Sequence, residues 1–334
     1  MLKSKALVVG FTVVTLLLTS ACGTGDDRSR PYEGPYIDVH MHSDYPIENF
    51  GPPPLALCSG GWGADLRYDN RETWADIESS YFKTPRCDSP VWSAMTNAEV
   101  EDGIIAEMHR LNVTGVVIGD RATVDRWKER LPGQVIWAHF PFGANLDAAA
   151  FDDVEVLAEV AYQYLGIPQS DQRTAAMWAQ AAKLDIPVGA HIGPARPGQA
   201  LLGGPTAGYR ASLSSPLALE EVLSRHPNLR VYAMHAGWPF RDDMIAMLYA
   251  YPGLYVDTGM MHYLLPREEY YAYYQALIRA GFIDRIMFSS DVIVWPEIIE
   301  EGIKAINEMP FLTYEQKKAI LHDNAARFFR IEEN

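Results

Sequence analysis

The chain has 334 residues, of which 48% are hydrophobic, and it carries a formal net charge of −15. This globular composition provides a core large enough for one domain of α/β-barrel size or for two smaller domains. The acidic balance argues against nucleic acid or an anionic membrane surface as a partner, because their phosphates require lysine and arginine.

The N-terminus has the pattern of an export signal. A short basic start precedes an apolar stretch over residues 6–18, which is too short to cross a membrane. The segment that follows, Leu18-Thr19-Ser20-Ala21-Cys22, resembles the processing site of bacterial lipoproteins, with threonine where leucine is usual. The resemblance implies removal of residues 1–21, lipidation of Cys22, a flexible tether over residues 22–35 and membrane anchoring in the cell envelope. A plain secretory signal and an uncleaved anchor are the alternatives.

Two further cysteines, Cys58 and Cys87, remain if Cys22 carries lipid. An even pair in an exported protein predicts a disulfide. This bond closes a loop of about 30 residues and stabilises the fold by about 3–4 kcal/mol in the loop-entropy description. Two unpaired thiols are the alternative.

Residues 43–96 form a long insertion without a regular hydrophobic period. The insertion contains glycine and proline clusters and several aromatic residues. A stretch of this length is either disordered or functional. Its aromatic residues and the predicted disulfide favour an ordered lid or pocket wall, and surface decoration is the alternative.

Around and beyond this insertion, short β-branched runs alternate with helical patterns. We expect strands at residues 36–42, 113–118, 134–140, 154–160, 187–192, 230–234, 254–256 and 285–289. We expect helices at residues 97–110 with Asn97 as the cap, 121–130, 146–151, 171–184, 216–226, 242–249, 266–280, 297–307 and 313–328. The run at 154–160 can also be read as a helix.

Strand–helix alternation implies parallel pairing with right-handed crossovers. Eight such units predict a (β/α)8 barrel over residues 36–334, with the insertion after its first strand. A doubly wound open sheet is the alternative. No glycine-rich phosphate-binding motif follows a strand, which argues against a nucleotide-binding fold.

The first strand ends in His40 and His42. Residues i and i+2 of a strand point to the same face, so the two imidazoles can converge on one point, as a metal site requires. Taken alone, the pair can equally be two surface residues.

Other polar residues stand at the ends of later strands: Glu159, His191, His235 and Asp291. In a barrel these ends meet at the face that carries the active site. Imidazole and carboxylate groups suit zinc, manganese or iron. The sequence therefore predicts a metal centre at this face.

The same residues carry a family resemblance. The pattern consists of the His-x-His pair, the strand-five His191, the His-Ala-Gly segment at His235, the strand-eight Asp291 and the closing segment Ile320–Phe329, which is similar to an N-A-x-R-x-F helix. Over residues 36–330 the chain resembles the amidohydrolase superfamily, in the branch that includes aminocarboxymuconate semialdehyde decarboxylase and dicarboxylate-lactone hydrolases.

The resemblance implies roles for these residues. His40, His42, His191 and Asp291 are expected to bind metal, and His235 to bind a second ion or to act as a catalytic imidazole. Glu159 is similar to the strand-four glutamate of TatD-type hydrolases and decides between one ion and two, with a structural or surface carboxylate as its alternative. Zinc is expected first, with manganese or iron as alternatives. The strand-four lysine of other amidohydrolases has no counterpart.

We expect hydrolysis of an ester, lactone or amide-like bond of a small molecule. The metal would activate water, Asp291 would take its proton and His235 would stabilise the oxyanion. A metal-dependent decarboxylase and a non-catalytic envelope-binding protein are the alternatives, and a homodimer stays open.

Four residues near the expected strand ends are candidates for substrate contact. Arg196, with Arg210 in the same loop, would bind a carboxylate. His262 would reach the substrate from the loop after strand seven, and Trp238 and Trp295 would form pocket walls. Solvation of the arginines and core packing of the histidine and tryptophans are the alternatives.

Overall fold

The computed structural model describes residues 27–43, 46–52, 54–58, 69, 71–85, 87–141, 151–193 and 195–332. The expected signal peptide, Cys22 and most of the expected helix at 146–151 lie outside these residues. Within the described ranges, no helix is both long and apolar enough to span a membrane.

An eight-stranded parallel sheet forms the centre of the fold, in the order β1-β4-β5-β6-β7-β8-β9-β10. Its strands are β1 (Tyr36–His42), β4 (Val113–Ile118), β5 (Val135–His139), β6 (Val156–Val160), β7 (Val188–His191), β8 (Val231–Met234), β9 (Leu254–Asp257) and β10 (Ile286–Met287). Spatial order follows chain order, which confirms the predicted barrel and excludes the doubly wound sheet. The ambiguous run at 154–160 is a strand.

Backbone hydrogen bonds join the two edges of this sheet. The N–H groups of Val39, Asp291 and His42 donate to the carbonyl oxygens of Phe288, His40 and Val292, at 2.9 to 3.1 Å. They hold the end of β1 against the segment after β10. The barrel therefore closes at the positions of the predicted metal ligands.

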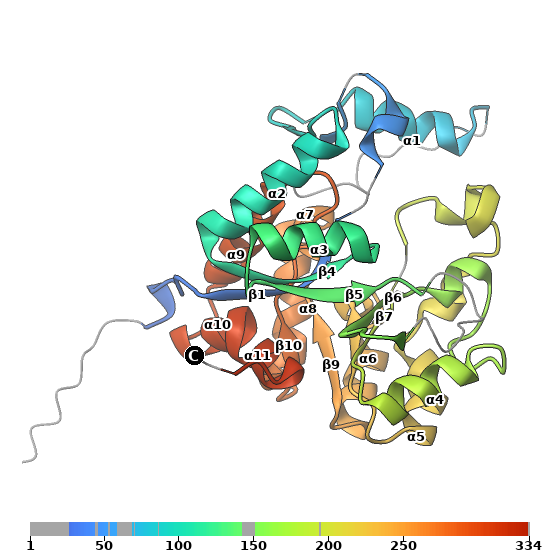
Figure 1. Ribbon diagram of the computed structural model, residues 1–334, viewed down its shortest axis with the longest axis vertical. Coiled ribbons are helices and arrows are strands. Elements are labelled where there is room, and N and C mark those ends of the chain that lie inside the picture. Colours follow the sequence, from blue (N-terminus) through green and yellow to red (C-terminus); the bar gives the residue numbers. More distant parts are fainter. Residues whose placement is uncertain are drawn as a thin grey trace, which may run out of the picture.

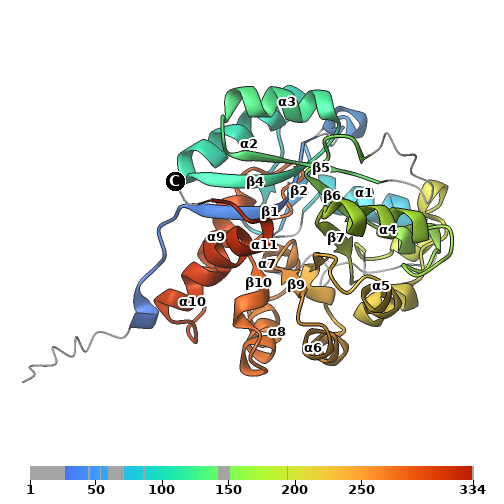
Figure 2. The same ribbon diagram turned by 60° about the horizontal axis from the view of Figure 1, so that its bottom comes forward.

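Helices surround the sheet (Figures 1 and 2). Their bounds are α1 (Trp74–Lys83), α2 (Asn97–Leu111), α3 (Arg121–Arg130), α4 (Ala175–Leu184), α5 (Glu220–Arg225), α6 (Arg241–Ala250), α7 (Met261–Leu264), α8 (Arg267–Arg279), α9 (Ile298–Asn307), α10 (Tyr314–Lys318) and α11 (Asn324–Phe329). A π-helical turn over Ala319–Asp323 joins α10 to α11.

Two helix starts differ from the prediction. The cap of α2 is Thr96 and not Asn97, because Thr96 Oγ1 accepts from the Glu99 N–H while the Glu99 side chain accepts from the Thr96 N–H. The α4 helix begins at Ala175 and not at Asp171, whose carboxylate accepts from the Arg173 N–H and holds a turn there.

Residues 27–35 pack on the barrel, although the sequence assigned them to a flexible tether. The Tyr32 N–H donates to Asn307 Oδ1 at 2.8 Å, and Asn307 Nδ2 donates back to the Tyr32 carbonyl at 3.0 Å. The buried Lys317 donates to the carbonyl oxygens of Arg28 and Arg30. The expected tether can therefore extend only to about residue 26.

The described part of the insertion is ordered. It contains α1 and the two-stranded pair of β2 (Ala56–Leu57) and β3 (Val91–Trp92). A disulfide joins Cys58 to Cys87, with the two Cα atoms 5.8 Å apart. The Trp295 indole donates to the Leu55 carbonyl at 3.0 Å and attaches the insertion to the segment after β10. The N-terminal segment leaves β1 on the side away from α1 (Figure 1).

Candidate active site

The predicted ligands meet at the carboxyl ends of the strands. They divide into two neighbouring groups, the β1 group (His40, His42 and Asp291) and the β6–β8 group (Glu159, His191 and His235). Overlapping sets of three from these residues bring their ligand atoms within 4.8 Å of one another. The fold thus brings together all six side chains that the sequence selected.

The β1 group is compact. His40 Nε2 lies 3.2 Å from His42 Nε2 and 3.3 Å from Asp291 Oδ1, and His42 Nε2 lies 3.2 Å from the same oxygen. His40 is fully buried, and Asp291 is 2% exposed. Two imidazoles and one carboxylate therefore converge on a single point.

The β6–β8 group is built around a carboxylate. Glu159 Oε1 contacts His191 Nδ1 and lies 3.4 Å from His235 Nε2. These two ring nitrogens are 3.2 Å apart. His235 Nδ1 lies 3.9 Å from Asp291 Oδ2, which makes the two groups one continuous cluster. The Glu159 side chain thus reaches the site.

The backbone turns sharply at two of these residues. His235 has φ 58° and Asp291 has φ 54°, the left-handed region that side chains other than glycine seldom adopt. His235 directly follows β8, and Asp291 lies in the segment after β10, so each turn directs its side chain back into the barrel mouth. Such backbone conformations cost about 1–3 kcal/mol and occur frequently at functional sites.

Asp257 belongs to the site and was missed in the sequence. Its Oδ1 accepts from the backbone N–H groups of His235 at 2.7 Å and Gly259 at 3.0 Å, and its Oδ2 lies 3.5 Å from His40 Nδ1. It ends β9, a strand for which no end residue had been selected, and it is fully buried. A carboxylate at this strand end was the available signal.

The carboxylates give the site a strongly negative electrostatic potential. Burial alone would lower the pKa of His40, but Asp291 and Asp257 outweigh it and raise that pKa to about 10. Burial also opposes ionisation of Glu159, yet His191 and His235 hold its pKa well below the usual range. Positive charge is therefore favoured at this position.

A cavity of about 340 Å³ opens onto this cluster. Its floor consists of His42, Glu159, His191, His235 and Asp291. Its wall includes Phe50, Leu55, Leu57 and Phe82 from the insertion, and Ala195, Arg196, Gln199 and Thr206 from the loop after β7. In the described residues, the insertion is therefore a pocket wall, which favours that prediction over surface decoration.

Tyr164 is a second residue that the sequence did not reveal. It lines the cavity just after β6, and its ring meets the His191 ring edge-on with centroids 5.2 Å apart. Nothing in the local pattern distinguishes it from Tyr162 nearby, which is buried in the core.

Two of the predicted substrate contacts line the cavity. Arg196 does so while paired with Glu78 of α1, at 3.1 Å. Trp295 also lines it, with its indole N–H bonded to Leu55. Arg210 instead donates to the carbonyl oxygens of its own loop.

The other two do not line this cavity. Trp238 borders a smaller neighbouring cavity, and its indole N–H donates to Glu269 Oε1 at 3.0 Å. His262 lies behind the floor, 2% exposed, where Nε2 donates to the Ile298 carbonyl at 3.1 Å. The structure therefore does not bring His262 into this cavity, because its ring lies against Gly302.

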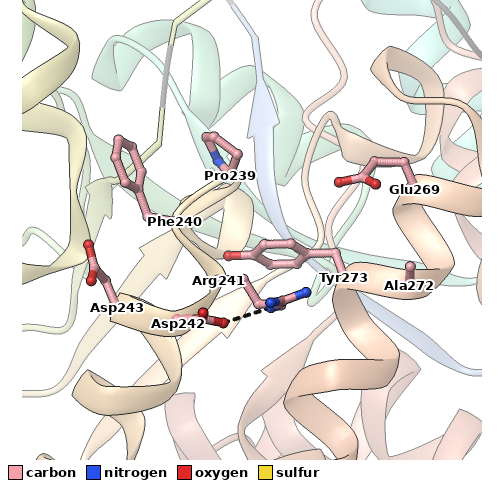
Figure 3. A pocket seen from close by; sticks show the side chains of 8 residues that line it. All are labelled: Pro239, Phe240, Arg241, Asp242, Asp243, Glu269, Ala272 and Tyr273. Atoms are coloured by element: carbon pink, nitrogen blue, oxygen red, sulfur yellow. Dashed lines mark hydrogen bonds and ion pairs between the residues drawn. The ribbon is translucent and has the colours of Figure 1, made fainter.

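Another cavity of about 360 Å³ lies on the outside of the barrel (Figure 3). It is lined by Pro239, Phe240, Arg241, Asp242, Asp243, Glu269, Ala272 and Tyr273 of α6, α8 and the approach to α6. Arg241 pairs with Asp242 at 2.8 Å. This lining contains no histidine and no member of the cluster, so the barrel mouth is the candidate active site.

Comparisons with solved structures give the same architecture. An uncharacterised TIM-barrel protein from Bordetella bronchiseptica is 16% identical with a TM-score of 0.58, covering 88% of this chain and 98% of its own. A probable 2-pyrone-4,6-dicarboxylic acid hydrolase from Acinetobacter baumannii is 13% identical with a TM-score of 0.55, covering 89% and 99%. The 5-carboxyvanillate decarboxylase from Sphingomonas paucimobilis is 13% identical with a TM-score of 0.51, covering 89% and 99%.

At these identities the structural likeness establishes the fold alone. The comparison with curated proteins gives no match. A family match covers nearly the whole barrel, from residue 37 to residue 331. Together with the cluster at the barrel mouth, it places the chain in the amidohydrolase family.

Proposed function

We propose that this protein is a metal-dependent hydrolase that cleaves an ester, lactone or amide-like bond of a small molecule. The observation that carries the proposal is the position of Asp291. Its carboxylate lies against both imidazoles of the His40–His42 pair and also lines the cavity. A proton acceptor thus stands between the expected metal position and the substrate space.

The donor set fits a divalent cation. His40 Nδ1 faces Asp257 Oδ2 at 3.5 Å, and His235 Nδ1 lies 3.2 Å from the Gly259 carbonyl, which can only accept a hydrogen bond. With a cation bound, the rings would be neutral, each Nδ1 would carry the proton and each Nε2 would direct its lone pair into the cluster. Metal-binding histidines are oriented in this way.

The imidazole-rich set favours zinc, with manganese and iron as alternatives. When bound, the ion lowers the pKa of water toward about 7 and polarises a substrate carbonyl. The β1 group would hold one ion. Glu159, His191 and His235 would complete a second site beside it.

Among the side chains of the site, Asp291 has the main chemical role, which is proton transfer. Its carboxylate is charged at neutral pH, because His40 and His42 outweigh the effect of burial and lower its pKa. We assign it to accept the proton of the attacking water and to return that proton to the leaving group. With a cation bound, a neutral His235 would serve as a ligand through Nε2, whereas only the protonated ring would offer an Nε2–H donor to an oxyanion.

The test begins with metal. We expect stoichiometric metal in the purified protein, loss of hydrolysis on chelation and recovery with zinc or manganese. His42→Ala and His191→Ala separate the two groups. If two ions bind, each variant retains about one ion per chain. If a single ion binds, only the variant that lacks one of its ligands should lose metal affinity, by roughly 100-fold or more.

The substrate class is tested with lactones, aryl esters and aromatic carboxylates while carbon dioxide is monitored. Hydrolytic products that depend on metal support the proposal. Carbon dioxide release without a hydrolytic product would establish the decarboxylase instead. Protein without metal that stays inactive after zinc or manganese is added would favour the non-catalytic binding protein.

We also propose that the protein resides in the cell envelope, anchored through lipid on Cys22. The sequence before Cys22 supports this location. Mass spectrometry of the mature protein should find a lipidated N-terminal Cys22, and Cys22→Ala should release the protein from membranes. An unmodified N-terminus after residue 22, or wild-type protein in the soluble fraction, would contradict the proposal.

A further inference from the structure

A second cavity, of about 200 Å³, lies beside His235. It is lined by Ala195, Pro197, His235, Trp238, Met260, Met261, Leu264 and Leu265, which we call the side chamber. We infer that the side chamber binds an apolar group about the size of a benzene ring, carried by the substrate close to its scissile bond. This inference deepens the proposed hydrolase function and rests on it.

The side chamber adjoins the main cavity. Ala195, His235 and Met260 line both spaces. Of these, His235 is a member of the cluster at which the proposed function places the reacting carbonyl. A group that enters the side chamber is therefore attached to the substrate within a short distance of the bond to be cleaved.

The chemistry of the lining selects an apolar group. His235 is its only titratable member, and its Nδ1 is already directed at the Gly259 carbonyl. Trp238 contributes carbon surface, since its only side-chain polar atom donates to Glu269. A charged or strongly polar group placed here would lose its hydration without new hydrogen bonds.

The size of the side chamber sets the size of the group. An apolar protein cavity of about 150 Å³ accommodates benzene. At about 200 Å³, the side chamber has space for a phenyl or cyclohexyl group with a linking carbon. Met260 and Met261 add flexible side chains that adapt to differences in shape.

The walls exist without a ligand. Met261 is 4% exposed and Leu265 is 7% exposed, and both belong to the main hydrophobic core. Leu264 is half-buried at the edge of that core and is the member that a larger side chain can replace with least disturbance. Leu264→Trp is therefore the variant that should fill the side chamber.

The first experiment compares the benzyl and methyl esters of an acid that the metal-loaded enzyme hydrolyses. Their leaving alcohols have similar acidity, so a difference in rate reports binding of the ring. We expect kcat/KM to be at least about tenfold higher for the benzyl ester. Leu264→Trp should bring the ratio close to one. Leu184→Trp, which adds the same bulk at an exposed position on α4, should leave the ratio as in the wild type.

The second experiment measures fluorobenzene binding by fluorine NMR and requires no catalysis. We expect saturable binding to wild type and to Leu184→Trp, and its loss in Leu264→Trp. Binding that persists in Leu264→Trp, or a benzyl preference that this variant leaves intact, would overturn the side chamber while the hydrolase function stands. Specific fluorobenzene binding in a protein that hydrolyses no ester, lactone or amide would instead overturn the function and leave the side chamber in place.

Discussion

The floor and the wall of the main cavity are built in different ways. The floor consists of side chains at the ends of parallel strands, fixed by the backbone hydrogen bonds that close the barrel. The wall consists of irregular segments held by the Cys58–Cys87 disulfide, the Arg196–Glu78 ion pair and the hydrogen bond from Trp295 to Leu55. The barrel fold thus determines the floor, and pairwise contacts between loops determine the wall.

We expect the floor to carry the catalytic chemistry and the wall to determine which substrates bind. Floor residues are held at positions that every barrel of this kind provides, whereas loops vary without disturbing the sheet. Substitutions in the floor should therefore reduce kcat. Substitutions in the wall should change KM, substrate preference or stability while the chemistry continues.

The largest effect is expected in the floor, for Asp291→Asn. The amide cannot accept the proton of water, so kcat should fall by roughly 10²–10⁴-fold. Kinetics on a hydrolysed ester, with metal content measured in parallel, will separate lost proton transfer from lost metal. Asp242→Asn, in the outer cavity of Figure 3, is the matched control and should retain wild-type kcat. An unchanged kcat in metal-loaded Asp291→Asn would remove Asp291 from the mechanism.

The second effect concerns the wall. Replacing both Cys58 and Cys87 by serine should lower the free energy of unfolding by about 3–4 kcal/mol, because the unfolded chain is no longer constrained. Leu55 and Leu57 precede Cys58 and line the cavity, so KM should rise more than kcat falls. Urea denaturation and steady-state kinetics measure both quantities. Reduced wild type should match the double variant, and equal stability of oxidised and reduced protein would contradict the prediction.

The third effect tests the buried position of His262 behind the floor. Burial lowers its pKa from about 6.5 to about 4, so the folded protein keeps the ring neutral while the unfolded chain protonates it. Its contribution to stability is therefore complete above pH 6.5 and is lost as the pH falls toward 4, by about 3 kcal/mol. His262→Gln should be less sensitive to acid over this range in denaturation experiments.

Kinetics complete this test. His262→Gln should retain wild-type kcat and KM at pH 8, because the side chain lies behind the floor. His109→Gln, at an exposed position on α2, is the control for the substitution itself and should also retain wild-type kcat and KM. A large increase in KM for His262→Gln alone would place His262 in the cavity after all.

The barrel and its floor could be predicted because they follow from local rules. Alternating β-branched and helical patterns fix parallel strands, and the period of two along β1 directs His40 and His42 to one side. Asp257 was not predicted as a site residue because the expected strand ended at residue 256, whereas β9 extends one residue further and includes this carboxylate. A boundary error of one residue was enough to hide it.

The positions outside the strands depend on geometry that no short pattern contains. The single turn α7 places Met260 and Tyr263, three residues apart, toward the main cavity and turns His262 to the opposite side. No pattern in the loop sequence predicts that turn. Apart from the cysteine pair, the residues that contact the insertion could not be predicted either, because they lie far from it in the sequence.

The smallest effect is expected in the wall, for Glu78→Gln. Glu78 is paired with Arg196 Nη1, and removing the charge of this carboxylate makes that end of the guanidinium available to an anionic substrate group, while Nε keeps its bond to Gln199. Because a partly exposed ion pair contributes up to about 1 kcal/mol, KM for an ester that carries a free carboxylate should fall by roughly fivefold or less. The neutral analogue of the same ester should show an unchanged KM, and so should both esters with Glu72→Gln, an exposed glutamate shortly before α1. Equal changes for the charged and the neutral ester would mean that Arg196 stabilises the wall through Glu78 and does not recognise the substrate.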